Sequence, residues 1–217
     1  MSSILVFAVV FSSGAALVYL AMAHRSARLK RESYVRHFVF PAPILKSLTK
    51  IYPGLEEKDQ FLAARALRQY FLVHLRAGTR AVGMPSRVVD ALWHDFILDT
   101  KSYHTFCAKA FGQYFHHIPA GRKAMTGSKG EAMRLTWHLA CLEENIDPRN
   151  ATRLPLLFAI DAKLKIPDGH VYDLEVVKKS PREAADGGGC SGFGCTGGND
   201  CSSSGCSGGC GGGCGGD

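Results

Sequence analysis

The sequence predicts a mainly α-helical protein with an N-terminal transmembrane helix, one multi-helix globular domain and a disordered Gly/Cys-rich C-terminal tail. The first 23 of the 217 residues carry no charged side chain, whereas the last 31 hold 15 of the 24 glycines and six of the eight cysteines. All 26 lysines and arginines lie between these ends, in a segment long enough for one hydrophobic core. Within it, apolar residues recur at helical spacing without alternating strands. This distribution excludes a multidomain enzyme, a collagen-like repeat and a small disulfide scaffold.

Residues 1–23 are predicted to form a membrane anchor. The run over 4–23 is uncharged and apolar except at Ser12, Ser13 and Gly14, and twenty residues at a helical rise of about 1.5 Å match a hydrocarbon core of about 30 Å. There are two alternatives. The segment could be a signal peptide cleaved near Ala23, which would make the protein secreted or periplasmic, or it could be a buried helix of a soluble protein. Nothing basic precedes the apolar run, which favours the uncleaved anchor.

Basic residues follow the apolar run and predict its orientation. They are His24, Arg25, Arg28, Lys30 and Arg31. The positive-inside tendency places the N-terminus outside and the domain in the cytoplasm, and the same residues can contact anionic headgroups of the lipid bilayer. No nucleic acid is expected as a partner, because the basic residues are dispersed and no aromatic–basic motif accompanies them.

The middle of the chain divides into a basic juxtamembrane segment and linker over 24–54 and an α-helical domain over 55–180. The clearest helix covers 55–77, since it opens with Glu56 and Glu57, closes with Arg76 and is followed by Gly78. Further helices are predicted over 85–99, from Thr100 to about 112 and from a capping box at Ser128 and Glu131. The apolar segment 154–164 could be a helix or a buried strand, and Pro155, which suits a first helical turn, favours the helix. A short strand is predicted over 171–177.

Residues 90–119 concentrate the side chains that could carry chemistry. The candidate metal ligands are His94, Cys107, His116 and His117, with His104 as a fifth. Asp90 precedes His94 by four residues, so on a helix the two share a face and the carboxylate can fix the imidazole tautomer. A helical hairpin could bring such ligands together, and zinc would accept two imidazoles and a thiolate with a water in the fourth position.

The same segment also has the composition of a hydrophobic core. Trp93 and Tyr103 stand among several phenylalanines, and a cysteine in such surroundings is commonly a small buried apolar residue. Under this interpretation Asp90, Trp93 and Tyr103 have structural roles, and the histidines bond to backbone or carboxylate groups. The spacing matches no short zinc signature, so the metal and core interpretations both stay open.

Part of this segment resembles a known family. The residues in question are Asp90, Trp93-His94, Tyr103, Cys107, Gly112, His117 and Pro119. Their layout resembles the D-x-x-W-H … Y-x-x-x-C … G … H-x-P pattern of the glycine-rich-domain protein family, best known in plants, and its bacterial membrane-anchored relatives with a Cys/Gly-rich tail. The resemblance covers about residues 55–165 and implies a helical domain without an agreed activity. Phe96 departs from the plant pattern, where a second histidine often stands.

Residues 181–217 form the predicted disordered tail. It has one aromatic residue, Phe193, and too little apolar surface to offset the loss of chain entropy on folding. Its cysteines are Cys190, Cys195, Cys201, Cys206, Cys210 and Cys214. Three interpretations of these cysteines are open. Reduced thiolates could bind a soft metal such as zinc or copper(I), or an oxidising compartment could pair the cysteines as disulfides. In the third interpretation the tail is a low-complexity end without a role.

The sequence contains no phosphate-binding loop, dinucleotide fingerprint or nucleophile elbow. We therefore expect a non-enzymatic, single-pass membrane protein that acts in interaction or assembly with other proteins, with a thiol-rich tail for soft metals. The alternative is a metal-dependent or redox enzyme that uses His94, Cys107 and His117, with zinc or copper as its cofactor.

Overall fold

The computed structural model describes the backbone of residues 2–117 and 129–179, and the side chains of residues 14, 16–117 and 130–177. These residues form eight helices and no strand, which confirms the predicted mainly α-helical class. The helices are α1 (Ser2–His37), α2 (Ala42–Ile51), α3 (Glu57–Ala77), α4 (Arg87–Leu98), α5 (Thr100–Ala110), α6 (Lys129–Glu143), α7 (Leu156–Lys163) and α8 (Leu174–Lys179).

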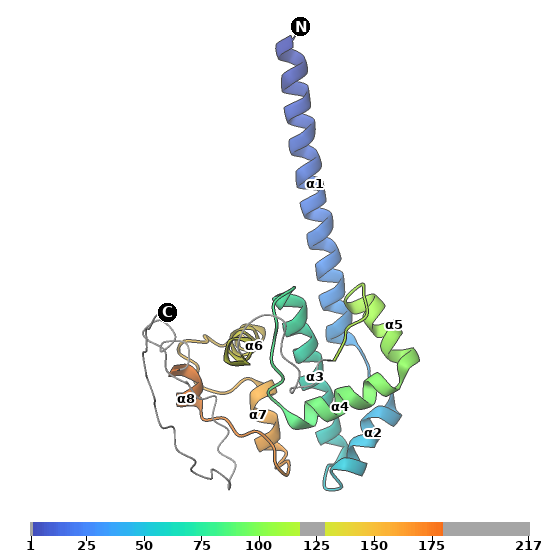
Figure 1. Ribbon diagram of the computed structural model, residues 1–217, viewed down its shortest axis with the longest axis vertical. Coiled ribbons are helices and arrows are strands. Elements are labelled where there is room, and N and C mark those ends of the chain that lie inside the picture. The colour runs from blue at the N-terminus through green and yellow to red at the C-terminus, as the bar shows by residue number, and fades with distance from the viewer. Residues whose placement is uncertain (1, 118–128, 180–217) are drawn as a thin grey trace, which may run out of the picture.

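Helix α1 projects far beyond the other helices (Figure 1). Large apolar side chains on its projecting part are exposed, with Tyr19 at 72% and Leu17 and Met22 at 67% each. Among the described residues, no helix combines the length and the apolar character that a bilayer-crossing segment needs. The span predicted over 4–23 lies in part on residues 4–13 and 15, whose side chains are outside those described.

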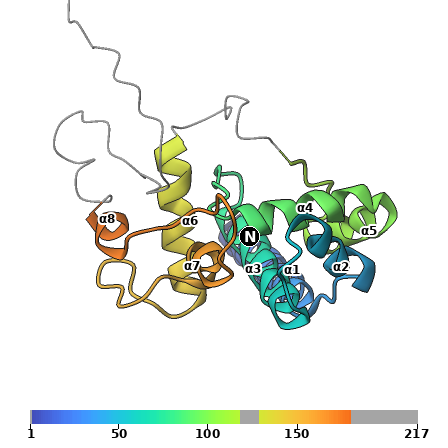
Figure 2. The ribbon, with the colours of Figure 1, turned by 90° about the horizontal axis from the view of Figure 1, so that it is seen from below.

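Helix α3 is the centre of the domain. Helices α1, α2 and α4 contact it on one side and α6 and α7 on the other, as Figure 2 shows from below. Leu67, Phe71 and Val73 of α3 are fully buried, as expected for a helix with apolar residues over a wide arc. The capping box of Glu56 with Asp59 begins α3, so the helix predicted over 55–77 is confirmed.

The segment 24–54, expected to be a linker, contributes to this core. Its buried apolar residues are Val35, Phe40, Ile44, Leu45 and Leu48. Three of them lie on α2, a helix that the sequence interpretation did not include because Pro41 and Pro43 are typical of a break in regular structure. Pro43 sits in the first turn of α2, where its missing N–H removes no helical hydrogen bond.

The strand predicted over 171–177 is wrong. Its first three residues belong to no regular element, and the remainder begins α8. The side chain of Asp173 accepts hydrogen bonds from the backbone N–H groups of Glu175 at 2.7 Å and Val176 at 3.4 Å. Asp173 thus caps the first turn of a helix. These hydrogen bonds favour a helix in this segment, although its apolar pattern is typical of a strand.

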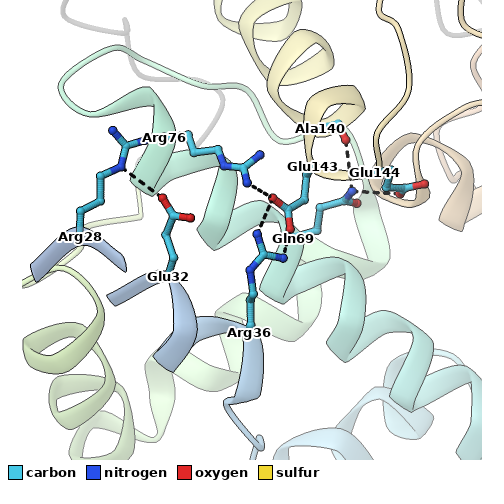
Figure 3. A network of polar contacts seen from close by, with 8 residues as sticks. All are labelled: Arg28, Glu32, Arg36, Gln69, Arg76, Ala140, Glu143 and Glu144. Atoms are coloured by element: carbon cyan, nitrogen blue, oxygen red, sulfur yellow. Dashed lines mark hydrogen bonds and ion pairs between the residues drawn. The ribbon is translucent and has the colours of Figure 1, made fainter. Parts of the chain in front are cut away.

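A network of charged side chains ties α1, α3 and α6 together (Figure 3). Glu143 of α6 accepts hydrogen bonds from Arg36 of α1 and pairs with Arg76 of α3, whose nitrogen is 2.6 Å from the carboxylate. The Glu143 side chain is only 7% exposed. One carboxylate therefore fixes the end of α1 to two helices of the domain.

Candidate metal centre

Asp90, His94 and His117 form a group in which one ligand atom from each residue lies within 4.8 Å of the others. Nε2 of His117 is 3.0 Å from Oδ1 of Asp90, and Nδ1 of His94 is 3.6 Å from Oδ2. The centroids of the two imidazole rings are 4.2 Å apart. Two imidazoles with one carboxylate are a donor set that zinc and other divalent transition metals accept.

Helix α4 supplies two of the three residues, and its N-terminus is firmly held. Ser86 caps it, and the buried carboxylate of Asp161 on α7 accepts from the Ser86 hydroxyl at 2.6 Å and from the Arg87 N–H at 2.8 Å. A carboxylate at this position satisfies N–H groups that lack partners within the helix and interacts favourably with the helix dipole. Asp90 and His94 therefore stand, one turn apart, on a rigid support.

His117 reaches the group from the segment that follows α5. The chain turns at Gly112, whose φ of 75° suits glycine. The Tyr103 hydroxyl donates to the carbonyl of Phe115 and accepts from Nε1 of Trp93 at 3.2 Å. Because the Phe115 ring also stacks on Trp93 at 5.2 Å, the chain is fixed over α4 two residues before His117. The His117 imidazole meets the Trp93 ring edge-on at 4.5 Å.

Hydrogen bonding indicates which nitrogen of His94 can bind a metal. Its Nδ1 is 2.8 Å from the backbone carbonyl oxygen of Asp90. A carbonyl only accepts, so Nδ1 carries the proton and Nε2 keeps its lone pair. Ligand atoms on a tetrahedral zinc ion stand about 3.3 Å apart, given bonds of about 2.0–2.1 Å. In the structure Nε2 of His117 hydrogen-bonds to Oδ1 of Asp90 at 3.0 Å, so a metal would replace this hydrogen bond, and the His94 ring would bind the metal through Nε2.

The group is open to solvent on one side. The side chain of His94 is 51% exposed and that of Asp90 35%, whereas that of His117 is 12% exposed. A metal held here by Asp90, His94 and His117 would keep a coordination position for water, as in catalytic rather than structural zinc sites.

The other predicted ligands in this segment are not members of the group. Cys107 is fully buried on the core face of α5. Burial raises the pKa of its thiol, and hydrogen bonds with the Phe115 backbone and with Tyr103 offset part of this rise. It supports the segment that carries His117. His116 and His104 are exposed. Pro119 and the six tail cysteines lie outside the described residues.

Sequence reasoning missed one histidine beside this site. The Nε2 atom of His74 on α3 is buried without a hydrogen-bond partner among the described residues, and burial lowers the pKa of the imidazole to about 3. The ring lies against Phe115 at 4.3 Å and Tyr70 at 4.7 Å. In the sequence, His74 has the position of an ordinary basic residue in a last helical turn, so no signal marked it.

Fold and site together define a class of protein, a helical domain with a two-histidine, one-carboxylate group on its surface and a long N-terminal helix. The chain belongs to the UCP032817-like family, whose model matches residues 30–193. Comparison with curated proteins and with solved structures gave no match. The resemblance to the glycine-rich-domain family stays a prediction, because the family match does not bear on it.

Proposed function

We propose that this protein is a membrane-anchored helical protein whose domain binds a divalent transition metal through Asp90, His94 and His117. The observation that carries the proposal is the proximity of the three ligand atoms, all within 4.8 Å of one another. Zinc suits the two imidazoles and the carboxylate. The role we assign is interaction or assembly with other proteins, in which the metal fixes the segment that carries His117 to α4.

The anchor in this proposal rests on the apolar residues 4–23 and on α1. A continuous helix with exposed Leu17, Tyr19 and Met22 leaves apolar surface that a lipid bilayer would cover. The basic residues that follow, such as Arg25 and Arg28, favour a cytoplasmic domain and an outside N-terminus.

The tail thiols are proposed as a second, softer metal site. Six cysteines at intervals of four to six residues, with zinc or copper(I) as the metal, would add to the metal content of the domain. A chain that ends at Asp186 should then bind less metal than the full chain. Equal metal content in the two proteins contradicts the role of the tail.

Elemental analysis of the full chain, expressed without a polyhistidine tag, tests the proposal. We expect the chain that ends at Asp186 to retain about one zinc per molecule, as a three-ligand site does. The same truncated chain carrying both His94→Ala and His117→Ala should lose it. A matched double variant of two exposed histidines outside the group, His104→Ala with His138→Ala, should keep it. A metal-free truncated chain would refute the domain site.

A second candidate, a metal-dependent enzyme, is favoured by the exposure of Asp90 and His94. A metal bound here would lower the pKa of a coordinated water toward neutral, and so supply a hydroxide nucleophile. The protein's own groups would orient that metal: the Asp90 carbonyl fixes the His94 ring, and Trp93 supports the ring of His117. A cobalt-substituted protein whose visible spectrum titrates with pH would support this candidate, and a pH-independent spectrum would oppose it.

A further inference from the structure

Two adjoining hollows lie between α3, the end of α6 and the loop that enters α7. Their volumes are about 430 and 420 Å³. Both are lined by Arg65, Glu144, Arg153 and Leu156, so they form one continuous depression, which we name the α3–α7 groove. Each hollow lies within the usual size of small-molecule sites, about 300–1,000 Å³.

Positive charge dominates the lining of this groove. Its cations are Arg36, Arg65, Arg68, Arg153 and Lys163, and its carboxylates are Glu143 and Glu144. Both carboxylates are already paired with arginines. Among the described residues, no carboxylate pairs with Arg65, Arg68 or Lys163. The groove therefore keeps an excess of cationic groups.

Two of these cations are held side by side. Arg65 and Arg68 are three residues apart on α3, a spacing at which like charges repel on a helix. The guanidinium of Arg68 donates to the Phe38 carbonyl at 3.0 Å, and burial, followed by the charge of Arg65, lowers its pKa. A bound anion would relieve this repulsion through charge-assisted hydrogen bonds.

Apolar side chains accompany the cations in one of the two hollows. They are Leu62, Leu154, Leu156 and Ala159. An inorganic anion would leave this surface uncovered, whereas an organic anion would cover it. The groove also includes Arg36, which follows the predicted anchor by 13 residues, about 20 Å along a helix. This distance favours a soluble ligand over a headgroup of the same bilayer.

We propose that the α3–α7 groove binds a soluble small molecule that carries a phosphate or carboxylate group on an apolar body. Arg65 and Lys163 bind the anionic group, and Leu62 and Leu154 contact the apolar part. This site is separate from the metal centre, since none of the residues that line it belongs to the group of Asp90, His94 and His117.

Titration calorimetry of the full chain in phosphatidylcholine nanodiscs tests the groove, with phenyl phosphate as the probe. The protein is first treated with a chelator, so that no metal-bound phosphate contributes. Inorganic phosphate and benzyl alcohol serve as probes that keep only the charge or only the apolar ring. We expect phenyl phosphate to bind at least about fivefold more tightly than either, because it alone uses both surfaces.

The variant that carries Arg65→Gln and Lys163→Gln should bind phenyl phosphate about tenfold more weakly, since it lacks two charge-assisted contacts. Both side chains are exposed, so the fold should persist, which the unfolding temperature checks. Arg149→Gln, an exposed arginine outside the groove, should leave the affinity within about twofold of the original, as surface changes do. The proposal is overturned if the double variant binds like the original, if inorganic phosphate binds as tightly as phenyl phosphate, or if phenyl phosphate does not bind.

Discussion

The carboxylate of Asp161 holds α4 in place, so the substitution Asp161→Asn should destabilise the domain. Asp161 is 2% exposed and accepts four hydrogen bonds. The Ser86 hydroxyl and the Val88 N–H donate to Oδ1 at 2.6 and 3.3 Å, and the N–H groups of Arg87 and His170 donate to Oδ2 at 2.8 and 2.9 Å. An amide in this position must direct an NH2 group at one of these two pairs.

The less costly orientation of the new amide places its nitrogen at the Oδ1 position. There the Ser86 hydroxyl can turn to accept, but the Val88 N–H is left buried without an acceptor, at a cost of about 1–3 kcal/mol. Loss of the negative charge at the N-terminus of α4 adds about 0.3–1 kcal/mol. We therefore expect Asp161→Asn to lower the free energy of unfolding by about 2–3 kcal/mol.

Urea unfolding of the full chain in detergent micelles, followed by tryptophan fluorescence, measures this loss. Trp137 is buried and meets the ring of Phe158 on α7 at 5.3 Å, so its emission reports on the elements concerned. The midpoint should fall by about 0.7–3 M, because the loss of about 2–3 kcal/mol is divided by slopes of about 1–3 kcal/mol per molar. Asp168→Asn is the matched control, because Asp168 is exposed and its φ of 55° is one that asparagine tolerates. Equal midpoints for the two variants would show that the Asp161 carboxylate does not hold α4 in place.

Three further predictions follow from side chains near the site and from the α1 contact. The pKa of His74 is about 3 in the folded protein and 6.5 ordinarily, so the free energy of unfolding decreases as the pH falls from 6.5 to 3. This decrease amounts to at most about 1.4 kcal/mol per pH unit. His74→Phe should abolish it, as urea unfolding at several pH values can measure. Tyr103→Phe, which frees the Phe115 carbonyl, should weaken zinc binding about tenfold in a chelator competition, and unchanged affinity would show that Tyr103 does not position His117. Glu143→Gln should lower the free energy of unfolding, followed by thermal unfolding, by about 1–2 kcal/mol, because two arginines lose their shared carboxylate. It should also speed amide exchange at the end of α1, and unchanged exchange there would show that Glu143 does not fix α1 to the domain.

The helices of the domain could be predicted where local chemistry marks their ends. Helix α3 has acidic residues and a capping box at its start and Gly78, with a φ of 66°, at its end. Helix α7 begins after Pro155, as its position before an apolar run suggested. The strand expected over 171–177 failed because Asp173 bonds to its own chain, a contact that the apolar pattern does not reveal.

The candidate site could be predicted only in part. The four-residue spacing of Asp90 and His94 already placed them on one helix face, but the approach of His117 depends on tertiary contacts of Tyr103 and Trp93. Cys107 stands four residues after Tyr103, so it shares the buried face of α5 with it. The sequence assigned Asp90 a supporting role, whereas the structure brings its carboxylate into the group itself.

Zinc competition with a chromophoric chelator tests the proposed metal site of Asp90, His94 and His117. The chain used ends at Asp186, which removes the tail thiols. His117→Ala is compared with His116→Ala, the adjacent histidine that lies outside the group. We expect one zinc per chain, with its affinity retained by His116→Ala and weakened at least about 100-fold by His117→Ala, because one of three ligands is lost. Equal affinity in the two variants, or no zinc binding by the unsubstituted chain, would contradict it.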